Sequence, residues 1–232
     1  MAISNKLDSI DRRLCEAGIL SPATWKTVLR QTEPMLYAGE LARHIQQFRS
    51  HIGVTPFVSS TRNILHDIRT PMPIPDKTIN IFQSEDVFEH VPYEEIPAVF
   101  EEIYRVLKAG GLFRLSVPDY RCPLMLDRSI KDEAGHPIFD PEGGGAFRDG
   151  KVVDGGHAWF PVYETVKALF EKSSFAIQGN VQYLHYTTSS GHSVLNPIDY
   201  SLGFVMRTPD HDKRVMSPPQ ALSIVIDAWK PC

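Results

Sequence analysis

Apolar and polar residues follow two different periods along the chain, and residues 1–32 carry the helical one. Apolar side chains recur at helical spacing up to Gly18, which predicts a first helix that ends there. The pair Ser21-Pro22 then predicts the start of a second helix, because serine is a favoured N-cap and proline fits the first helical position. We expect a helical N-terminal extension that packs on a larger domain, covers a pocket or contacts a second copy of the chain.

From residue 33 onward, short apolar runs alternate with amphipathic stretches. The runs predict strands at 34–39, 51–57, 63–68, 78–84 and 111–119. The stretches predict helices at 40–48 and 93–111, the second of which is expected to stop at Gly110-Gly111. Strands that alternate with helices predict a parallel sheet with helices on its faces, here in one domain of residues 33–232.

Residues 121–156 interrupt this rhythm with prolines and with the triplet Gly143-Gly144-Gly145. A long irregular segment inside a compact domain is usually functional or mobile. A helix at 159–175 and a strand at 176–184 are expected to follow. Two final strands, at 200–207 and 221–229, are expected to form an antiparallel pair at the edge of the sheet.

Composition narrows the class of protein. The 232 residues include 24 basic and 28 acidic side chains, a net charge of −4, which argues against a nucleic-acid partner. No apolar run approaches the roughly 20 residues of a membrane-spanning helix, and the N-terminal residues lack the apolar core of a secretion signal. Cys15, Cys122 and Cys232 are too widely spaced to indicate a disulfide framework or a zinc site. These features predict a reduced, cytoplasmic protein.

Six short motifs follow one another between residues 65 and 119. They are an acidic turn at Asp67, Pro71 to Asp76, a strand that ends at Ser84, Phe88-Glu89-His90, Glu102 to Gly111, and Val117-Pro118-Asp119. In this order they resemble the class I S-adenosylmethionine (SAM)-dependent methyltransferases, above all the small enzymes found in polysaccharide and natural-product gene clusters. Residues 156–175 and the C-terminal residues are similar as well, so the resemblance covers roughly residues 33–230.

The resemblance implies a Rossmann-like α/β fold with a mainly parallel seven-stranded sheet and an antiparallel C-terminal edge. It implies SAM as cofactor and methyl transfer, most readily at oxygen, to a small-molecule or glycan acceptor in a biosynthetic pathway. Residues 121–156 would shape the acceptor pocket. A homodimer is a further expectation.

The resemblance also assigns residues to the cofactor. The turn after the first strand supplies Tyr37, Ala38, Gly39 and Glu40, the next acidic turn supplies Asp67 and Ile68, and the fourth strand supplies Ser84, Glu85 and Asp86. Asp67 would accept a hydrogen bond from the adenine amino group. An aspartate that caps a helix or fixes a turn is the alternative for this residue.

Methyl transfer to a hydroxyl needs a group that removes its proton, and His157 is the first candidate. It follows Gly155-Gly156 at the end of the long segment. Asp119 is the second candidate, as a base or a substrate anchor, and His90 is the third. Either histidine can instead hold its loop by a hydrogen bond. Glu85, Asp86 and His90 lack a further ligand pair at a diagnostic spacing, so no metal site is expected.

Two departures from the family pattern leave a second function open. Glu40 and Leu41 stand where small residues usually follow the first strand, and Gly53 stands where an acid usually contacts the ribose. The alternative is a methyltransferase fold that has lost SAM chemistry. Such a protein would serve as a binding or assembly module, or as an enzyme that acts on a pathway intermediate without a methyl donor.

Overall fold

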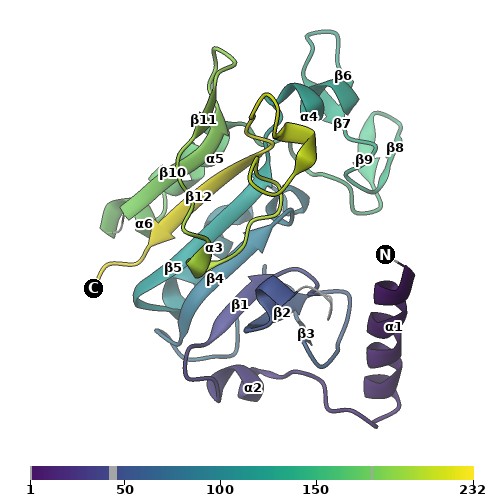
Figure 1. Ribbon diagram of the computed structural model, residues 1–232, viewed down its shortest axis with the longest axis vertical. Coiled ribbons are helices and arrows are strands. Elements are labelled where there is room, and N and C mark those ends of the chain that lie inside the picture. The colour runs from purple at the N-terminus through teal and green to yellow at the C-terminus, as the bar shows by residue number, and fades with distance from the viewer. Residues whose placement is uncertain (1, 42–45, 179) are drawn as a thin grey trace.

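A mixed eight-stranded sheet forms the centre of the computed structural model, which describes residues 2–41, 46–178 and 180–232 (Figure 1). The strand order is β11-β10-β12-β5-β4-β1-β2-β3. The strands are β1 (Met35–Ala38), β2 (His51–Thr55), β3 (Asn63–Leu65), β4 (Ile79–Glu85), β5 (Leu107–Pro118), β10 (Asn180–Thr187), β11 (Ser193–Leu195) and β12 (Ser223–Trp229). The helices are α1 (Ala2–Glu16), α2 (Trp25–Leu29), α3 (Ile96–Val106), α4 (Pro123–Arg128), α5 (Tyr163–Glu171) and α6 (Ser174–Gln178).

Strands β1 to β5 pair in parallel, whereas β12, β10 and β11 pair antiparallel at the other side of the sheet. The predicted α/β class, parallel centre and antiparallel C-terminal side are therefore confirmed. The sheet has one strand more than the seven expected, because the three residues of β11 pair with β10.

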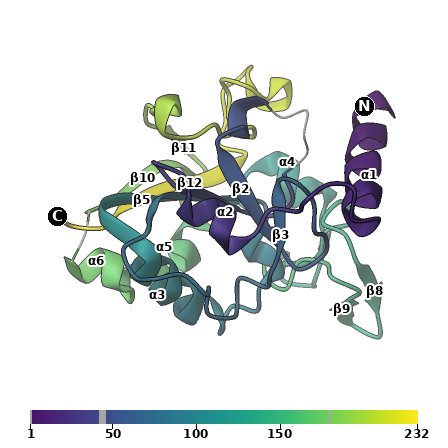
Figure 2. The same cartoon turned by 90° about the horizontal axis from the view of Figure 1, so that it is seen from below.

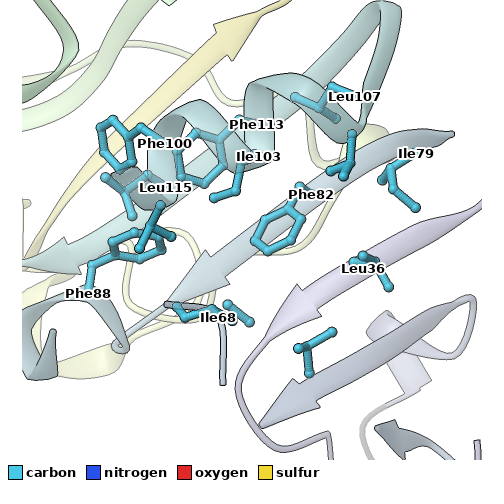
Figure 3. Close-up of a cluster of buried hydrophobic side chains, with 14 of the residues drawn as sticks. Leu36, Ile68, Ile79, Phe82, Phe88, Phe100, Ile103, Leu107, Phe113 and Leu115 are labelled. Carbon is cyan, nitrogen blue, oxygen red and sulfur yellow. The ribbon is translucent and has the colours of Figure 1, made fainter. Parts of the chain in front are cut away.

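One face of the sheet packs against α3, α5 and α6 (Figure 2). The apolar stripe of α3 meets alternate side chains of β4 and β5, so that Phe100 and Phe113 lie with ring centroids 5.3 Å apart (Figure 3). Phe82 and Phe88 extend this aromatic cluster toward the carboxyl ends of the strands. The largest apolar core of the described residues therefore holds β4 and β5 rigidly against the helices.

The opposite face is covered by the segment 196–222, which joins β11 to β12 and contains two short 3₁₀ helices, η3 (Tyr200–Leu202) and η4 (Lys213–Val215) (Figures 1 and 2). Arg114 of β5 lies fully buried beneath it. Its guanidinium binds both carboxylate oxygens of Asp227 on β12 at 2.7 Å and donates to the carbonyl of Asp199 at 3.0 Å. A buried ion pair with these partners fixes the segment to the sheet.

Several element predictions are wrong in detail. The helix expected to run to residue 111 ends at Val106, because its last carbonyls are taken by residues from elsewhere, among them Lys230, whose Nζ donates to Tyr104 and Leu107. Residues 200–207 form η3 and a loop rather than a strand, and β12 lies inside the sheet between β5 and β10 rather than at its edge. Of the helix expected at 40–48, residues 42–45 lie outside the described residues, and Gln46–Phe48 form the 3₁₀ helix η1.

The segment 121–156 is ordered rather than irregular. It contains α4 and two antiparallel hairpins, β6 (Ile130–Lys131) with β7 (Pro137–Phe139) and β8 (Ala146–Arg148) with β9 (Lys151–Val153). The N-terminal residues form α1 and α2, but α2 begins at Trp25 with Thr24 as its N-cap, so the helix start predicted at Ser21-Pro22 is wrong. Arg12 of α1 pairs with Glu40, and Asp11 accepts a hydrogen bond from the Thr61 hydroxyl at 2.8 Å. None of the described helices is long and apolar enough to cross a membrane.

Candidate functional site

The chain changes direction across the sheet between β1 and β4. From β1 it proceeds outward through β2 and β3, and it then returns to β4 and β5 on the other side. In open α/β sheets, ligands bind in the crevice outside the carboxyl ends of the strands at such a switch point. Here Ala38, at the end of β1, lies opposite Ser84 of β4. The structure therefore brings together Tyr37, Ala38 and Gly39 with the predicted residues of β4.

Gly39 has a backbone conformation that favours glycine, with φ +121°. A Cβ at this position would lie 3.1 Å from the ring of Tyr37 and 3.3 Å from Val87, so the turn is closely packed. Ser84 is fully buried, and its Oγ has no hydrogen-bond partner in the described part of the chain. A closely approached glycine and an unused hydroxyl at the switch point fit a bound cofactor.

The acids after Ser84 are held by the segment 196–222. Glu85 accepts the backbone N–H groups of Met206 and Arg207 at 2.9 and 3.0 Å, while the Arg207 guanidinium binds Asp86 at 2.7 Å. Burial, followed by the charge of Asp86, raises the pKa of Glu85 to about 7. Burial and these neighbouring acids also raise the pKa of Tyr37 well above its ordinary value. Asp86 itself adopts a left-handed conformation with φ +53°, a strain typical of functional turns.

The remaining predicted cofactor residues have other partners. Asp67 holds the guanidinium of Arg69 at 2.6 Å, and this hydrogen bond lowers the pKa of Asp67. Ile68 is buried in the apolar core (Figure 3). Glu40 is exposed and pairs with Arg12 of α1.

Gly53 does not lie at the end of the second strand, so the position assigned to it from the family pattern is wrong. It lies in the middle of β2, which ends at Thr55. A Cβ at Gly53 would lie 2.1 Å from Oδ1 of Asn63, whose side-chain amide accepts from and donates to the backbone of Leu41 at 2.7 and 3.0 Å. The glycine makes room for an asparagine that fixes the turn after β1.

A cleft of about 480 Å³ adjoins the carboxyl end of β4. It is lined by Asp86, Glu89, His90, Arg128, Glu142, Gly143, Gly144, His157, Met206, Arg207, Asp212 and Arg214. The lining comes from the 3₁₀ helix η2 (Phe88–His90), from residues 128–157 and from the segment 196–222. The charged lining suits a polar ligand, and it includes two of the three predicted catalytic residues.

His157 is oriented by a chain of hydrogen bonds. The Tyr120 hydroxyl donates to Asp140 at 2.5 Å and lies 2.5 Å from Nδ1 of His157. Burial, with a smaller contribution from His90, lowers the pKa of His157 to about 4, so the ring is neutral at pH 7. Gly143 packs directly on this imidazole, because a Cβ there would lie 2.8 Å from the ring. The glycine triplet of the sequence therefore allows the loop to close over His157.

The structure brings His90 next to His157, with ring centroids 4.7 Å apart. It places Asp119 in a different environment. Asp119 is fully buried, and its two carboxylate oxygens accept the backbone N–H groups of Arg121 and Thr187 at 3.0 and 2.6 Å. Burial raises the pKa of Asp119 to about 6. These contacts favour a role in joining the ends of β5 and β10.

Sequence reasoning missed Glu89 and the residues that orient His157. Glu89 stands in the quoted Phe88-Glu89-His90 motif, which was the available signal, but its full burial depends on residues 157–159. No local pattern marked Tyr120 or Asp140. Glu89, His90 and His157 each offer a ligand atom, and these atoms lie within 4.8 Å of one another.

The strand order and the switch-point site define the class of protein as the class I methyltransferase fold. Residues 35–115, from β1 into β5, match the family model described as a methyltransferase domain. The resemblance inferred from residues 65–119 is therefore confirmed. This match agrees with the expectation of a SAM-dependent methyltransferase.

The solved structures that are similar to this chain share low identity with it. A protein of Pyrococcus horikoshii OT3 is 14% identical, with 98% of this chain and 90% of that chain covered and a TM-score of 0.48. Two proteins described as SAM-dependent methyltransferases, from Methanosarcina mazei and Mesorhizobium loti, are 13% and 11% identical. They cover 85% and 84% of this chain and 92% and 90% of their own, each with a TM-score of 0.46. A comparison with curated proteins finds no match.

Proposed function

We propose that the protein transfers the methyl group of SAM to a hydroxyl group of a small molecule or glycan. The observation that carries this proposal is the switch point between β1 and β4, which lies inside the matched domain and opens beside a polar cleft. When bound, SAM supplies an activated methyl group on a positively charged sulfur. The residues of this chain would bind SAM, orient the acceptor and take up its proton.

The switch point suits a cationic ligand. Gly39 lets backbone approach the cofactor, and the unused Oγ of Ser84 offers a hydrogen bond. Glu85, Asp86 and Glu89 concentrate negative charge beside Tyr37. Opposite charges attract strongly where water is excluded, so these acids would favour the sulfonium.

The cleft suits a polar acceptor. Its volume of about 480 Å³ is in the range of small-molecule pockets, and its charged lining favours a hydroxylated ligand. Nδ1 of His157 is engaged by Tyr120, which leaves Nε2 to accept the proton of an acceptor hydroxyl. His90, adjacent to it, would hold the acceptor. The glycan acceptor, the biosynthetic role, the homodimer and the cytoplasmic location stay predictions.

Calorimetric titration with SAM and with S-adenosylhomocysteine tests the cofactor half of the proposal. Micromolar binding, about −8 kcal/mol, is expected for the wild-type protein. Gly39→Ala should remove it, because the new Cβ meets Tyr37 and Val87. Gly150→Ala is the matched control, since Gly150 also has positive φ but has open space around it. Transfer of labelled methyl groups to a panel of sugars and phenols then tests the acceptor.

One observation favours the second function, a fold without methyl transfer. Phe204 of the segment 196–222 packs against Phe48 on the face of Tyr37, and the next residues bind Glu85. The chain itself therefore occupies part of the switch-point surface. Folded wild-type protein that binds neither SAM nor S-adenosylhomocysteine would favour this function over methyl transfer.

A further inference from the structure

Glu89, His90 and His157 form a compact cluster at the inner end of the cleft. Two hydrogen bonds hold the two segments that supply them together. The N–H of Ala158 donates to the carbonyl of Glu89 at 2.7 Å, and the indole of Trp159 donates to the carbonyl of Phe88 at 2.9 Å. The cluster is thus built by η2 and residues 157–159 as one unit.

The hydrogen bonds of the two histidines define which nitrogen is free. His90 donates from Nδ1 to the carbonyl of Gly155 at 2.9 Å. The Tyr120 hydroxyl gives its proton to Asp140, so it accepts from Nδ1 of His157. Each ring therefore has Nδ1 engaged and Nε2 available, and a neutral imidazole binds metal ions through such a nitrogen.

Glu89 lacks the partner that a buried carboxylate needs. It is fully buried, and neither of its carboxylate oxygens has a hydrogen-bond partner among the described residues. The basic group beside it is Nε2 of His157, 3.7 Å from Oε1, which is too far for a hydrogen bond. Burying an unpaired charge in this way is costly.

The arginines of the cleft do not compensate Glu89, because each is paired with another acid. The pairs are Arg207 with Asp86, Arg128 with Asp140 and Arg214 with Asp212, at 2.5 to 2.7 Å. The site therefore lacks one positive charge.

We propose that Glu89, His90 and His157 bind a divalent transition-metal ion of the zinc type. Two imidazoles and one carboxylate are a donor set that such ions prefer. Ligand atoms about 2.1 Å from one ion lie roughly 3 to 3.5 Å apart. The 3.7 Å between Glu89 and His157 is close to this spacing, and the separations within the cluster, all within 4.8 Å, would close by about 1 Å around an ion. The bonds from Nδ1 to Gly155 and to Tyr120–Asp140 are the outer contacts that orient metal-binding histidines.

Three protein ligands leave positions on the ion for water or another oxygen. The cluster lines the cleft, so an acceptor hydroxyl would bind the ion in place of water, a consequence that rests on the proposed function. With Nε2 of His157 bound to the ion, the ion would replace this nitrogen in activating the hydroxyl, whose proton would pass to water in the cleft. Binding of the ion itself requires neither SAM nor an acceptor. The metal site can therefore be tested separately.

Titration of the chelator-treated full chain with Co²⁺, followed by its visible absorption, tests the site. We expect one tightly bound ion, displaced by Zn²⁺. Glu89→Gln should weaken binding by about 100-fold or more, and Tyr120→Phe, which removes an outer contact, by about 10-fold. Two control variants should bind Co²⁺ as tightly as wild type. Glu142→Gln changes an acid of the same cleft that is paired with an arginine, and His192→Gln changes an exposed histidine.

Thermal unfolding provides the second readout. Without metal, Glu89→Gln should unfold at no lower temperature than wild type, because neither carboxyl oxygen of Glu89 has a hydrogen-bond partner to lose among the described residues. Zn²⁺ should raise the unfolding temperature of wild type but not of this variant. If Glu89→Gln does not fold, the unfolding temperatures of His90→Gln with and without Zn²⁺ are compared with those of wild type instead. Wild type that binds no Co²⁺, or Glu89 and His90 variants that bind it as tightly as wild type, would overturn the proposal.

Discussion

Two buried carboxylates lie four residues apart at the same end of the sheet, and they differ in what holds them. Glu85 accepts two backbone N–H groups from the segment 196–222, whereas neither oxygen of Glu89 has a hydrogen-bond partner in the described part of the chain. The first acid fastens a loop, and the second is available to a ligand. A buried acid that has hydrogen-bond partners can be purely structural. A buried acid without any hydrogen-bond partner is the better candidate for binding a ligand.

The largest expected loss of stability comes from a variant that leaves a second buried acid without a partner. Arg114→Ala leaves Asp227 buried without its guanidinium, which should lower the free energy of unfolding by about 3–5 kcal/mol. Urea denaturation measures the change. Arg69→Ala, which breaks an exposed pair, is the control and should cost less than about 1 kcal/mol. A similarly small loss of unfolding free energy in both variants would contradict the idea that an unpaired buried acid is costly.

The next prediction concerns the cleft. His157→Ala should lower turnover by about 100-fold or more, the usual range for a lost proton acceptor, and should leave SAM affinity unchanged. Steady-state kinetics and calorimetry separate the two effects. Asp119→Asn serves as the comparison, because its carboxylate is already held by Arg121 and Thr187. Unchanged turnover in His157→Ala would make Asp119 the better candidate for the base.

The pH dependence of stability tests the loop-fastening acid. Because burial raises the pKa of Glu85 to about 7, folded protein holds this proton more tightly than unfolded protein does. The stabilisation is complete below about pH 4.5 and is lost as the pH rises through about 7. Relative to wild type, Glu85→Gln should therefore gain about 3 kcal/mol between pH 4.5 and 8. Denaturation at both pH values measures this, with the exposed Glu94→Gln as a flat control.

The smallest effect is expected at Asp67. Asp67→Ala should weaken SAM binding by about 10-fold, about 1.4 kcal/mol, if the carboxylate contacts the adenine. It should change the unfolding temperature little, because its pair with Arg69 is partly exposed. Asp76→Ala, another acid in an exposed arginine pair, is the matched control. Equal SAM affinity in both variants would leave Asp67 as a turn residue.

The sequence pattern predicted correctly those helices and strands whose stabilising contacts come from residues nearby in the chain. The strands at β1, β4 and β5 and the apolar face of α3 follow from short runs and helical spacing, and the motif order predicted the parallel sheet. The limits of α3 did not follow, because the helix end is held by Lys230, more than 120 residues away in the chain. The apolar run at 200–207 is typical of a strand, but Gln83 and Glu85 bind its backbone and hold it as a loop.

In the candidate site, too, the sequence could not predict contacts between residues far apart in the chain. His90 and His157 were predicted one by one, and the structure brings their rings together. Glu89 was not predicted as a site residue. A glutamate in a short turn is usually exposed, and the burial of this one depends on contacts with residues 157–159. Asp119 was predicted to act as a base from its position at a strand end, yet its oxygens serve backbone groups.

The position of β12 has a consequence for how the protein is made. This strand lies between β5 and β10, although it follows both in the chain. Until residues 223–229 have been synthesised, the facing edges of β5 and β10 carry unpaired backbone groups that can join other chains. The sheet therefore closes only once β12 has been made, and the risk of aggregation during folding depends on how long those two edges stay uncovered.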